Sequence, residues 1–190
     1  MHRMRCVVLV LFFACAATGQ ESSLEAQLRS RLLYTHGLEW PAIEALKPRE
    51  QVIELLLRNL DRHHRARRDS LDMGFRLWLS SILTLGHFAE KRAQEPLRKL
   101  LTDETIEDAI RANSAMSLAQ IDCPGNQDLL LTAFDLAKPD DQLFRLQIGN
   151  GLVHCADNVV QAKIESYARG EFGSGRQAFE KIADRMKKRN

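Results

Sequence analysis

The 190-residue sequence has none of the short motifs that mark many catalytic sites. It contains no Gly-x-Ser-x-Gly nucleophile elbow, no glycine-rich phosphate loop and no His-Glu-x-x-His metal motif. Its acidic residues fall mainly in expected turns and helix starts, where capping explains them. The neighbours His63-His64 and His154-Cys155 would point about 100° apart on a helix, which disfavours chelation of one ion. We therefore assign no catalytic residue, no metal ligand and no cofactor.

Long apolar runs are scarce. The one clear run, Cys6–Ala17, follows a basic start with Arg3 and Arg5 and is too short to span a bilayer comfortably. Small residues precede Gln20 at the two positions that signal peptidase reads, so residues 1–19 are predicted to be a signal peptide. We expect the mature chain that begins at Gln20 to be periplasmic or secreted, without a transmembrane span.

A lipid anchor is the less favoured alternative for the same segment. Cys15 follows a small residue, as in a lipoprotein signal, but Phe12 and Phe13 fit a lipobox poorly. The two alternatives predict different first residues, Gln20 for simple cleavage and a lipidated Cys15 for anchoring.

The expected mature chain has no excess of basic or acidic residues. The whole sequence has 27 Lys and Arg against 25 Asp and Glu, and residues 1–19 contribute Arg3 and Arg5 but no acidic residue. The 25 basic and 25 acidic residues that remain balance each other. The sequence therefore gives no support for bulk attraction to nucleic acid.

The clearest positive pattern lies in Arg92–Ile121. Pro96 suits the first turn of a helix, and leucines then recur at spacings of three and four on one face. The acidic stretch Thr102–Thr105 breaks this stripe and can cap a second helix, whose apolar stripe runs from Ala109 onwards. Small residues in the second helix would let a neighbouring helix approach closely: Ala112, Ser114, Ala115 and Ser117.

Part of this pattern recurs along the chain. Arg76, Arg111 and Arg145 are separated by 35 and 34 residues. A small residue stands four positions after each arginine and a leucine stands seven positions after it: Ser80 and Leu83, Ala115 and Leu118, Gly149 and Leu152. A period of this length is typical of a helical solenoid, in which each unit buries its apolar face against its neighbours.

The central repeat resembles the HEAT repeat, in the short HEAT-like form first associated with phycobilisome lyases. The shared features are the helix start Ala93–Leu97, the Leu-Leu-x-Asp turn Leu100–Asp103, and the Asp108 and Arg111 of the second helix. The resemblance covers about Ser70–Ala156. It implies an all-α fold, a right-handed α-α superhelix with helical caps at both ends, and usually a protein-binding role.

The predicted organisation has five parts. These are a signal peptide (1–19), an N-terminal helical cap (20–69), HEAT-like repeats (70–169), a linker (170–175) and a C-terminal helix (176–190).

Two cysteines, Cys123 and Cys155, remain in the mature chain, near the ends of corresponding helices in successive repeats. An exported protein meets an oxidising compartment, so we predict a disulfide between them. Two thiols packed as small apolar residues are the alternative. Stacked helices lie about 8–10 Å apart, whereas the Cα atoms of a disulfide must be closer than about 7 Å. Flexible helix ends would have to bring the two cysteines together.

Mixed charges between the leucines of two helices predict a binding surface for another protein. In a HEAT-like stack the second helices of successive hairpins commonly line the concave surface, and we assign helices 93–101 and 127–136 to it. Their polar residues are the candidate partner-binding residues: Glu95, Arg98, Lys99, Gln127, Asp128 and Asp135.

The basic cluster Arg58–Arg68, which includes Arg62 and Arg65, is a second candidate surface. A solvated helix end with cations near its C-terminal dipole is the preferred interpretation of that cluster. The C-terminal helix is a third surface, which we expect to cap the stack.

The resemblance implies a protein-binding role, and the signal peptide predicts export. Together they favour an interaction module in the bacterial envelope without catalytic activity, with a partner that the sequence does not identify. An immunity or inhibitor protein that neutralises an effector enzyme is one alternative, because such proteins are small, exported and helical. A chromophore-lyase-like enzyme is the other. The export signal argues against it, because those lyases act on cytosolic pigment proteins.

Overall fold

A computed structural model describes residues 24–33, 38–62, 73–137, 141–155, 157–170 and 174–189. Within these ranges the regular secondary structure is entirely helical, which confirms the all-α prediction. The predicted signal peptide, His63-His64 and Arg65 lie outside the described residues. No helix in the described part of the chain is both long and apolar enough to cross a membrane.

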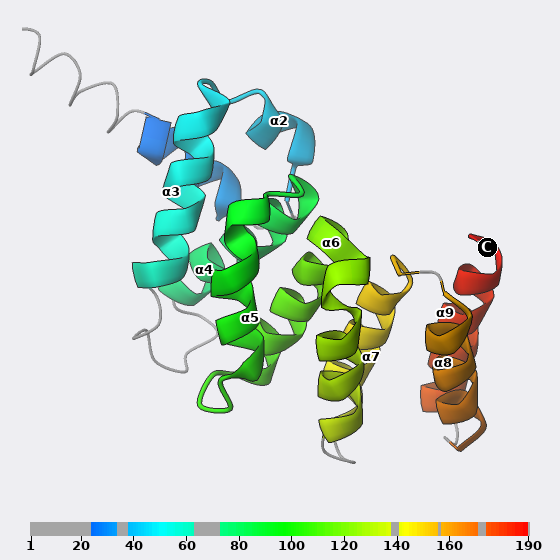
Figure 1. Cartoon of the computed structure of the whole chain (residues 1–190). Helices are drawn as coiled ribbons and strands as arrows, with labels where there is room; N and C mark the ends of the chain where they lie inside the picture. The colour runs from blue at the N-terminus through cyan, green and yellow to red at the C-terminus, as the bar shows by residue number, and fades with distance from the viewer. Residues whose placement is uncertain are drawn as a thin grey trace, which may run out of the picture.

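Figure 1 shows the order of the helices along the chain. Residues 24–32 form the first helix. The others are α2 (Trp40–Glu44), α3 (Arg49–Arg62), α4 (Met73–His87), the 3-10 turn η1 (Lys91–Ala93), α5 (Gln94–Thr102), α6 (Asp108–Leu136), α7 (Gln142–Leu152), α8 (Asn158–Gly170) and α9 (Ser174–Lys187).

The long helix α6 consists of two helical segments joined at Asp122. This residue has an extended backbone (φ −160°, ψ 85°), and its carboxylate accepts a hydrogen bond from the N–H of Gly125 at 3.1 Å. Asp122 therefore caps the second segment, and Pro124 lies in its first turn, where no N–H is needed. We call residues 108–121 the first segment of α6 and residues 123–136 the second segment.

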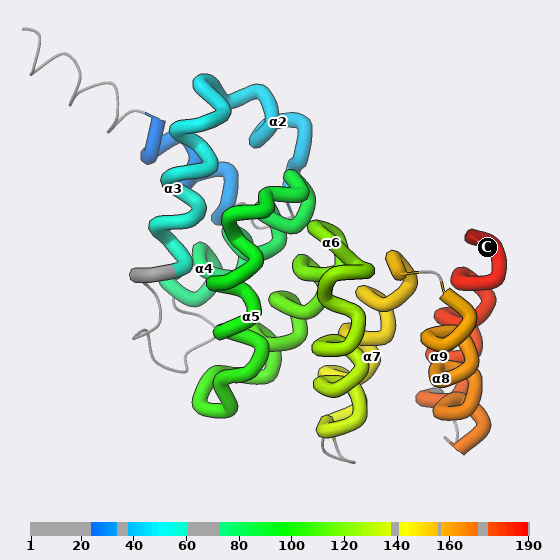
Figure 2. Tube along the Cα trace, in the orientation of Figure 1, coloured from blue at the N-terminus to red at the C-terminus, as the bar shows by residue number. Residues whose placement is uncertain are grey.

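The helices are arranged in two layers (Figures 1 and 2). One layer contains α3, α5, the second segment of α6, and α8. The other contains α4, the first segment of α6, α7 and α9, and each of these packs on the next. Each pair of helices consecutive in the chain contributes one helix to each layer.

Small residues allow the second layer to pack closely, as the sequence predicts. Ser117 donates a hydrogen bond to the carbonyl of Ile82 at 3.0 Å, and a Cβ on Gly86 would lie 2.7 Å from that of Ser117. A Cβ on Gly151 of α7 would lie 3.1 Å from the Cα of Met116. The small residues of the first segment of α6 are all buried: Ala112, Ser114, Ala115 and Ser117.

The repeated arginines have equivalent roles in two of the three repeats. Arg111 Nε donates to the carbonyl of Leu101 at 3.1 Å, at the end of α5. Arg145 Nε donates to the carbonyl of Phe134 at 3.3 Å, near the end of α6. Each guanidinium thus satisfies a terminal carbonyl of the preceding helix. Arg76 differs because it is exposed on α4.

The C-terminal helix α9 buries its apolar face against α7 and α8. It starts at Ser174 and α8 continues to Gly170, so the connection is shorter than the predicted linker 170–175. Four residues at spacings of three and four form the buried face: Phe179, Ile182, Ala183 and Met186.

Candidate functional site

Two of the three residues on α5 that were predicted to bind a partner, Glu95 and Arg98, make contacts within the protein. Arg98 Nε donates to the side-chain oxygen of Asn126 at 2.9 Å, and its other nitrogens reach Glu95 at 2.9 Å and the carbonyl of Gly125 at 3.3 Å. Arg98 therefore joins α5 to the second segment of α6. Lys99 is exposed.

Two of the predicted residues on the second segment of α6 join it to α8. Gln127 donates to the carboxylate of Asp157 at 2.6 Å, and Asp135 forms an ion pair with Lys163 at 2.5 Å. Asp128 is exposed. Half of the predicted surface thus holds neighbouring helices of one layer together.

The reason for assigning these helices to a concave surface is wrong. The prediction took helices 93–101 and 127–136 to be the second helices of their hairpins. In the structure α5 packs against the first segment of α6, which follows it, and the second segment of α6 packs against α7. Both are therefore the first helices of their pairs. The side chains of Arg62 and Arg65 lie outside the described residues, so that alternative surface is not placed.

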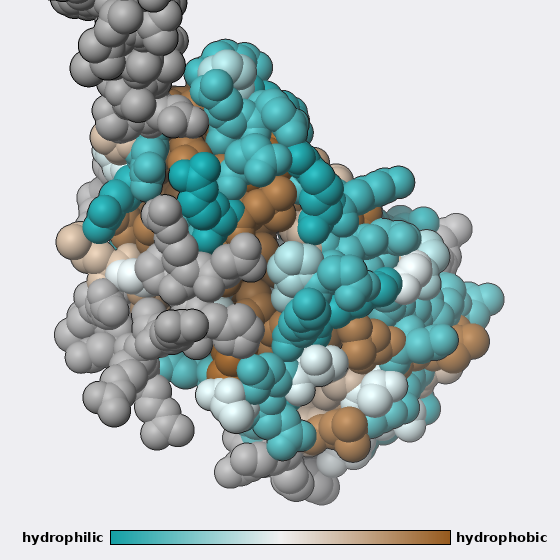
Figure 3. All heavy atoms as spheres, turned by 60° about the vertical axis from the view of Figure 1, so that its left-hand side comes forward, coloured by the Kyte–Doolittle hydropathy of each residue, from teal (hydrophilic) through white to brown (hydrophobic). Residues whose placement is uncertain are grey.

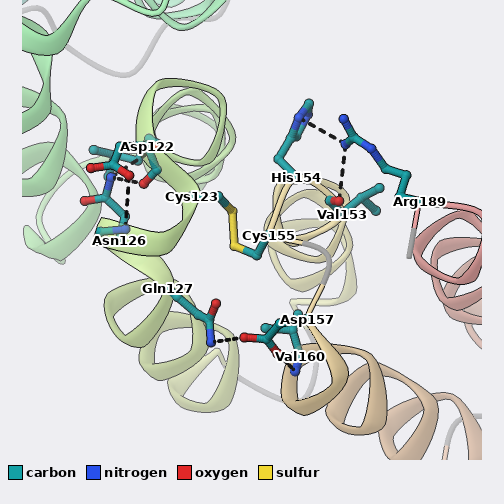
Figure 4. Close-up of a disulfide and its surroundings, with 12 residues drawn as sticks. Asp122, Cys123, Asn126, Gln127, Val153, His154, Cys155, Asp157, Val160 and Arg189 are labelled. Carbon is teal, nitrogen blue, oxygen red and sulfur yellow. Dashed lines mark hydrogen bonds between the residues drawn. A yellow bond between two sulfur atoms is a disulfide. The ribbon is translucent and has the colours of Figure 1, made fainter.

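Cys123 and Cys155 stand at disulfide distance, as predicted, with sulfur atoms 1.92 Å apart and Cα atoms 4.9 Å apart (Figure 4). Cys123 begins the second segment of α6 and Cys155 follows the end of α7, so the pair closes one end of this helix pair. The close approach arises at helix ends, where the chain can come nearer than stacked helix axes allow.

Charged side chains flank this cysteine pair (Figure 4). The backbone N–H of Val160 donates to Asp157 at 2.8 Å, and this bond, together with the one from Gln127, holds the pKa of Asp157 below its ordinary value. The pKa of His154 is also lowered, first by burial and then by the charges of Arg189 and Arg185. Asp157 caps α8, and His154 contacts Arg189, which follows the end of α9.

A groove of about 440 Å³ lies where two helix pairs end, and we call it the helix-end groove. The loop between α5 and α6 forms one wall, and the last turns of α6 with the start of α7 form the other. Its lining residues are Leu101, Thr102, Glu104, Thr105, Ile106, Glu107, Asp108, Arg111, Leu129, Thr132, Ala133, Leu136, Ala137, Asp141 and Phe144.

Arg111 and Phe144 form part of the floor of the groove. The guanidinium carbon of Arg111 lies 4.8 Å from the centre of the Phe144 ring, and its NH1 nitrogen pairs with Asp108 at 2.9 Å. With the bond to Leu101, these contacts satisfy the arginine within the protein. The apolar contribution comes from Ile106, Leu129 and their neighbours.

The rim of the groove is acidic and carries an exposed leucine. Leu136 is 78% exposed, and Leu143 at the start of α7 is 66% exposed. In the space-filling view, hydrophobic side chains are exposed among hydrophilic ones in the lower part of the molecule, where the α5–α6 loop and the end of α6 lie (Figure 3). Glu104 and Glu107 stand on the opposite wall.

This groove was not predicted from the sequence, because acidic residues at these positions were expected to cap helices. Asp103 accepts hydrogen bonds from the N–H and hydroxyl of Thr105 at 2.9 and 2.6 Å, so it shapes the loop and does not cap α6. Glu107, at the N-cap position of α6, makes no side-chain cap bond. Two features of the sequence could have indicated the groove. One is the acidic loop between α5 and α6, which the helix pattern does not require, and the other is Leu136, just before the turn that follows α6.

Among the described residues, no group of three or more His, Cys, Asp or Glu side chains is placed to hold a metal ion. No model of a known protein family matches the sequence, and a search of curated proteins finds no match.

Proposed function

We propose that this chain is an exported HEAT-like repeat protein that binds another protein and catalyses no reaction of its own. The helix-end groove is the observation that carries this proposal. It combines an apolar floor, a charged rim and the exposed Leu136 on a helical frame. An accessible apolar patch with a polar rim is the usual composition of a protein-binding surface.

The proposed architecture is a right-handed α-α superhelix with helical caps. The equivalent use of Arg111 and Arg145, 34 residues apart, supports it. In such stacks each unit packs against its neighbours, and the loops at one end often form the binding face. The helix-end groove lies between two successive loop ends and fits this arrangement.

The proposed location is the periplasm or the outside of the cell. Disulfides persist mainly in exported proteins, so the proximity of Cys123 and Cys155 supports it alongside the N-terminal sequence. Intact-mass analysis of protein from the cell envelope should give Gln20 as the first residue. Retention of Met1 would contradict cleavage, and a lipid on Cys15 would establish anchoring instead.

The binding proposal is tested with the mature chain as bait in envelope extracts. A captured protein is purified, and its dissociation constant for the mature chain is measured by calorimetry. Leu136→Ser should weaken binding at least about fivefold, because truncating an interface anchor commonly costs more than about 1 kcal/mol. Val159→Ser is the matched control, because Val159 is 67% exposed on α8, away from the groove.

Three further variants test the other candidate surfaces. Lys99→Glu tests the predicted binding surface on α5 and the second segment of α6 without breaking the Arg98–Asn126 contact. Lys181→Glu tests the exposed side of α9. Arg62→Glu combined with Arg65→Glu probes the basic cluster. Loss of binding in one of these variants alone would move the site away from the groove. Turnover of a substrate by the purified, partner-free protein would overturn the non-enzymatic proposal.

A further inference from the structure

The charge of the helix-end groove differs from that of the chain as a whole. Four carboxylates line it against one guanidinium, whereas the mature chain has equal numbers of acidic and basic residues: the carboxylates belong to Glu104, Glu107, Asp108 and Asp141. The groove is therefore a local concentration of negative charge on an otherwise balanced protein.

The structure uses only part of this negative charge internally. Asp108 pairs with Arg111, and Asp141 accepts the N–H of Phe144 as the cap of α7. Within the described residues, neither Glu104 nor Glu107 takes part in an ion pair or a side-chain hydrogen bond. These two carboxylates are available to a partner.

Helix dipoles do not offset the carboxylates. The groove faces the C-terminal ends of α5 and α6, which carry partial negative charge, and the N-terminal ends of α6 and α7, which carry partial positive charge. The two kinds of end are equal in number. The side chains on the rim therefore set the sign of the local field.

The apolar residues of the groove require a ligand that also carries apolar side chains. Ile106 and Leu129 contribute to the floor, and Leu136 projects from the edge with most of its surface exposed. A purely hydrophilic cation would leave this surface in water. A ligand that fits both features needs positive charge and large apolar side chains close together.

We propose that the helix-end groove binds a basic amphipathic segment of the partner protein, in which lysine or arginine accompanies apolar side chains at helical spacing. This inference rests on the proposed protein-binding function and specifies the class of partner. The apolar side chains cover Leu136 and the floor, and the basic side chains pair with Glu104 and Glu107. Recognition of an amphipathic helix by an apolar groove with complementary charge is a common mode of peptide binding.

A synthetic peptide provides the first test. The probe is a fluorescent Leu/Lys peptide about 18 residues long with leucines at helical spacing, because shorter peptides form helices poorly. The controls are a scrambled peptide of equal composition and a Leu/Glu peptide with the same leucine pattern. Fluorescence anisotropy with the mature chain should show that the patterned Leu/Lys peptide binds at least about tenfold more tightly than either control, and less tightly as salt is raised.

Variants assign this binding to the groove. Glu104→Gln combined with Glu107→Gln removes two charges with little change of shape and should weaken Leu/Lys peptide binding at least about fivefold. Glu39→Gln combined with Asp184→Asn removes the same charge at exposed sites outside the groove and should leave binding unchanged. Equal effects of the two double variants, or no preference for the patterned peptide, would overturn the proposal.

The captured partner separates this inference from the broader function. If Leu136→Ser weakens partner binding and Glu104→Gln with Glu107→Gln does not, the groove binds protein but the basic-segment proposal is wrong. If both weaken it, the proposal stands. If concentration-dependent dimers are lost in the Glu104→Gln, Glu107→Gln variant, the occupant is a second copy of this chain, which would also overturn the proposal.

Discussion

At the scale of single residues, two arginines with the same position in the repeat have different surroundings. Arg111 lies at the floor of the helix-end groove with its side chain 19% exposed. Arg145 is 6% exposed, bonds to the carbonyls of Phe134 and Ala137, and lies 4.7 Å from the centre of the Tyr167 ring. The bond from an arginine to the end of the preceding helix therefore lies beside an accessible groove at Arg111 and in the core at Arg145.

Replacement of Arg145 should be strongly destabilising. Arg145→Met keeps much of the side-chain volume but leaves the carbonyls of Phe134 and Ala137 without their guanidinium donor, so we expect a loss of about 2–4 kcal/mol. Urea denaturation measures this change. Arg76→Met, at the exposed arginine of the series, should change stability by less than about 0.5 kcal/mol. Similar losses in both variants would show that burial of Arg145 is not the cause.

Ala115 tests the close contact between the first segment of α6 and α7. Ala115 is fully buried, and its carbonyl would lie 3.5 Å from a Cβ on Gly151. Ala115→Leu should overpack this contact and cost about 1–3 kcal/mol. Ala109→Leu places the same side chain on the exposed face of the same helix and should be nearly neutral. An unchanged melting midpoint for Ala115→Leu would mean that the helix contact can relax.

At the scale of helices, much of the architecture could be predicted from the sequence. The leucine spacing predicted α5, and the apolar stripe from Ala109 predicted the first segment of α6. The position of the groove could not be predicted, because it arises where the loop after α5 meets the end of α6, about thirty residues later. Charge alternation also could not distinguish Arg98, which joins two helices, from Lys99, which faces solvent.

The cap of α8 should make stability depend on pH. Asp157 has a pKa below its ordinary value because its charged form accepts the N–H of Val160 and the amide of Gln127. The unfolded chain then binds the proton more readily, so this stabilisation is present above the ordinary pKa and is lost as the pH falls towards the lowered value. Below about pH 5, the free energy of unfolding should therefore fall more steeply for the natural chain than for Asp157→Asn.

Asparagine is a suitable control at this position because it caps helices well without titrating. Asp157→Asn should therefore change stability little at neutral pH and mainly reduce the acid dependence. Asp128→Asn, at an exposed carboxylate, should leave the acid dependence unchanged. If the natural chain and Asp157→Asn lose stability in parallel on acidification, Asp157 does not contribute to the pH dependence.

At the scale of the whole molecule, the described helices are connected by contacts between neighbours within each layer. Polar side chains join α5, α6 and α8 in one layer, and small residues bring α4, α6 and α7 together in the other. Within the described residues, no helix packs closely on all the others, so the arrangement depends on each neighbouring pair of helices. The Cys123–Cys155 pair lies at the junction where the second segment of α6, α7 and α8 meet.

A disulfide at this junction should stabilise the molecule by about 3–4 kcal/mol, because it closes a loop with a sequence separation of 32 and restricts the unfolded chain. The comparison is between the mature chain and Cys123→Ser combined with Cys155→Ser, both unfolded in urea without reductant. Adding reductant should bring the natural chain to the stability of the variant and leave the variant unchanged. Thiol titration of the unfolded, unreduced mature chain should find no free thiol, because only these two cysteines follow residue 19. Two free thiols, together with stability that reductant does not alter, would show that the cysteines are packed as thiols, and the proposed oxidising location would lose its structural support.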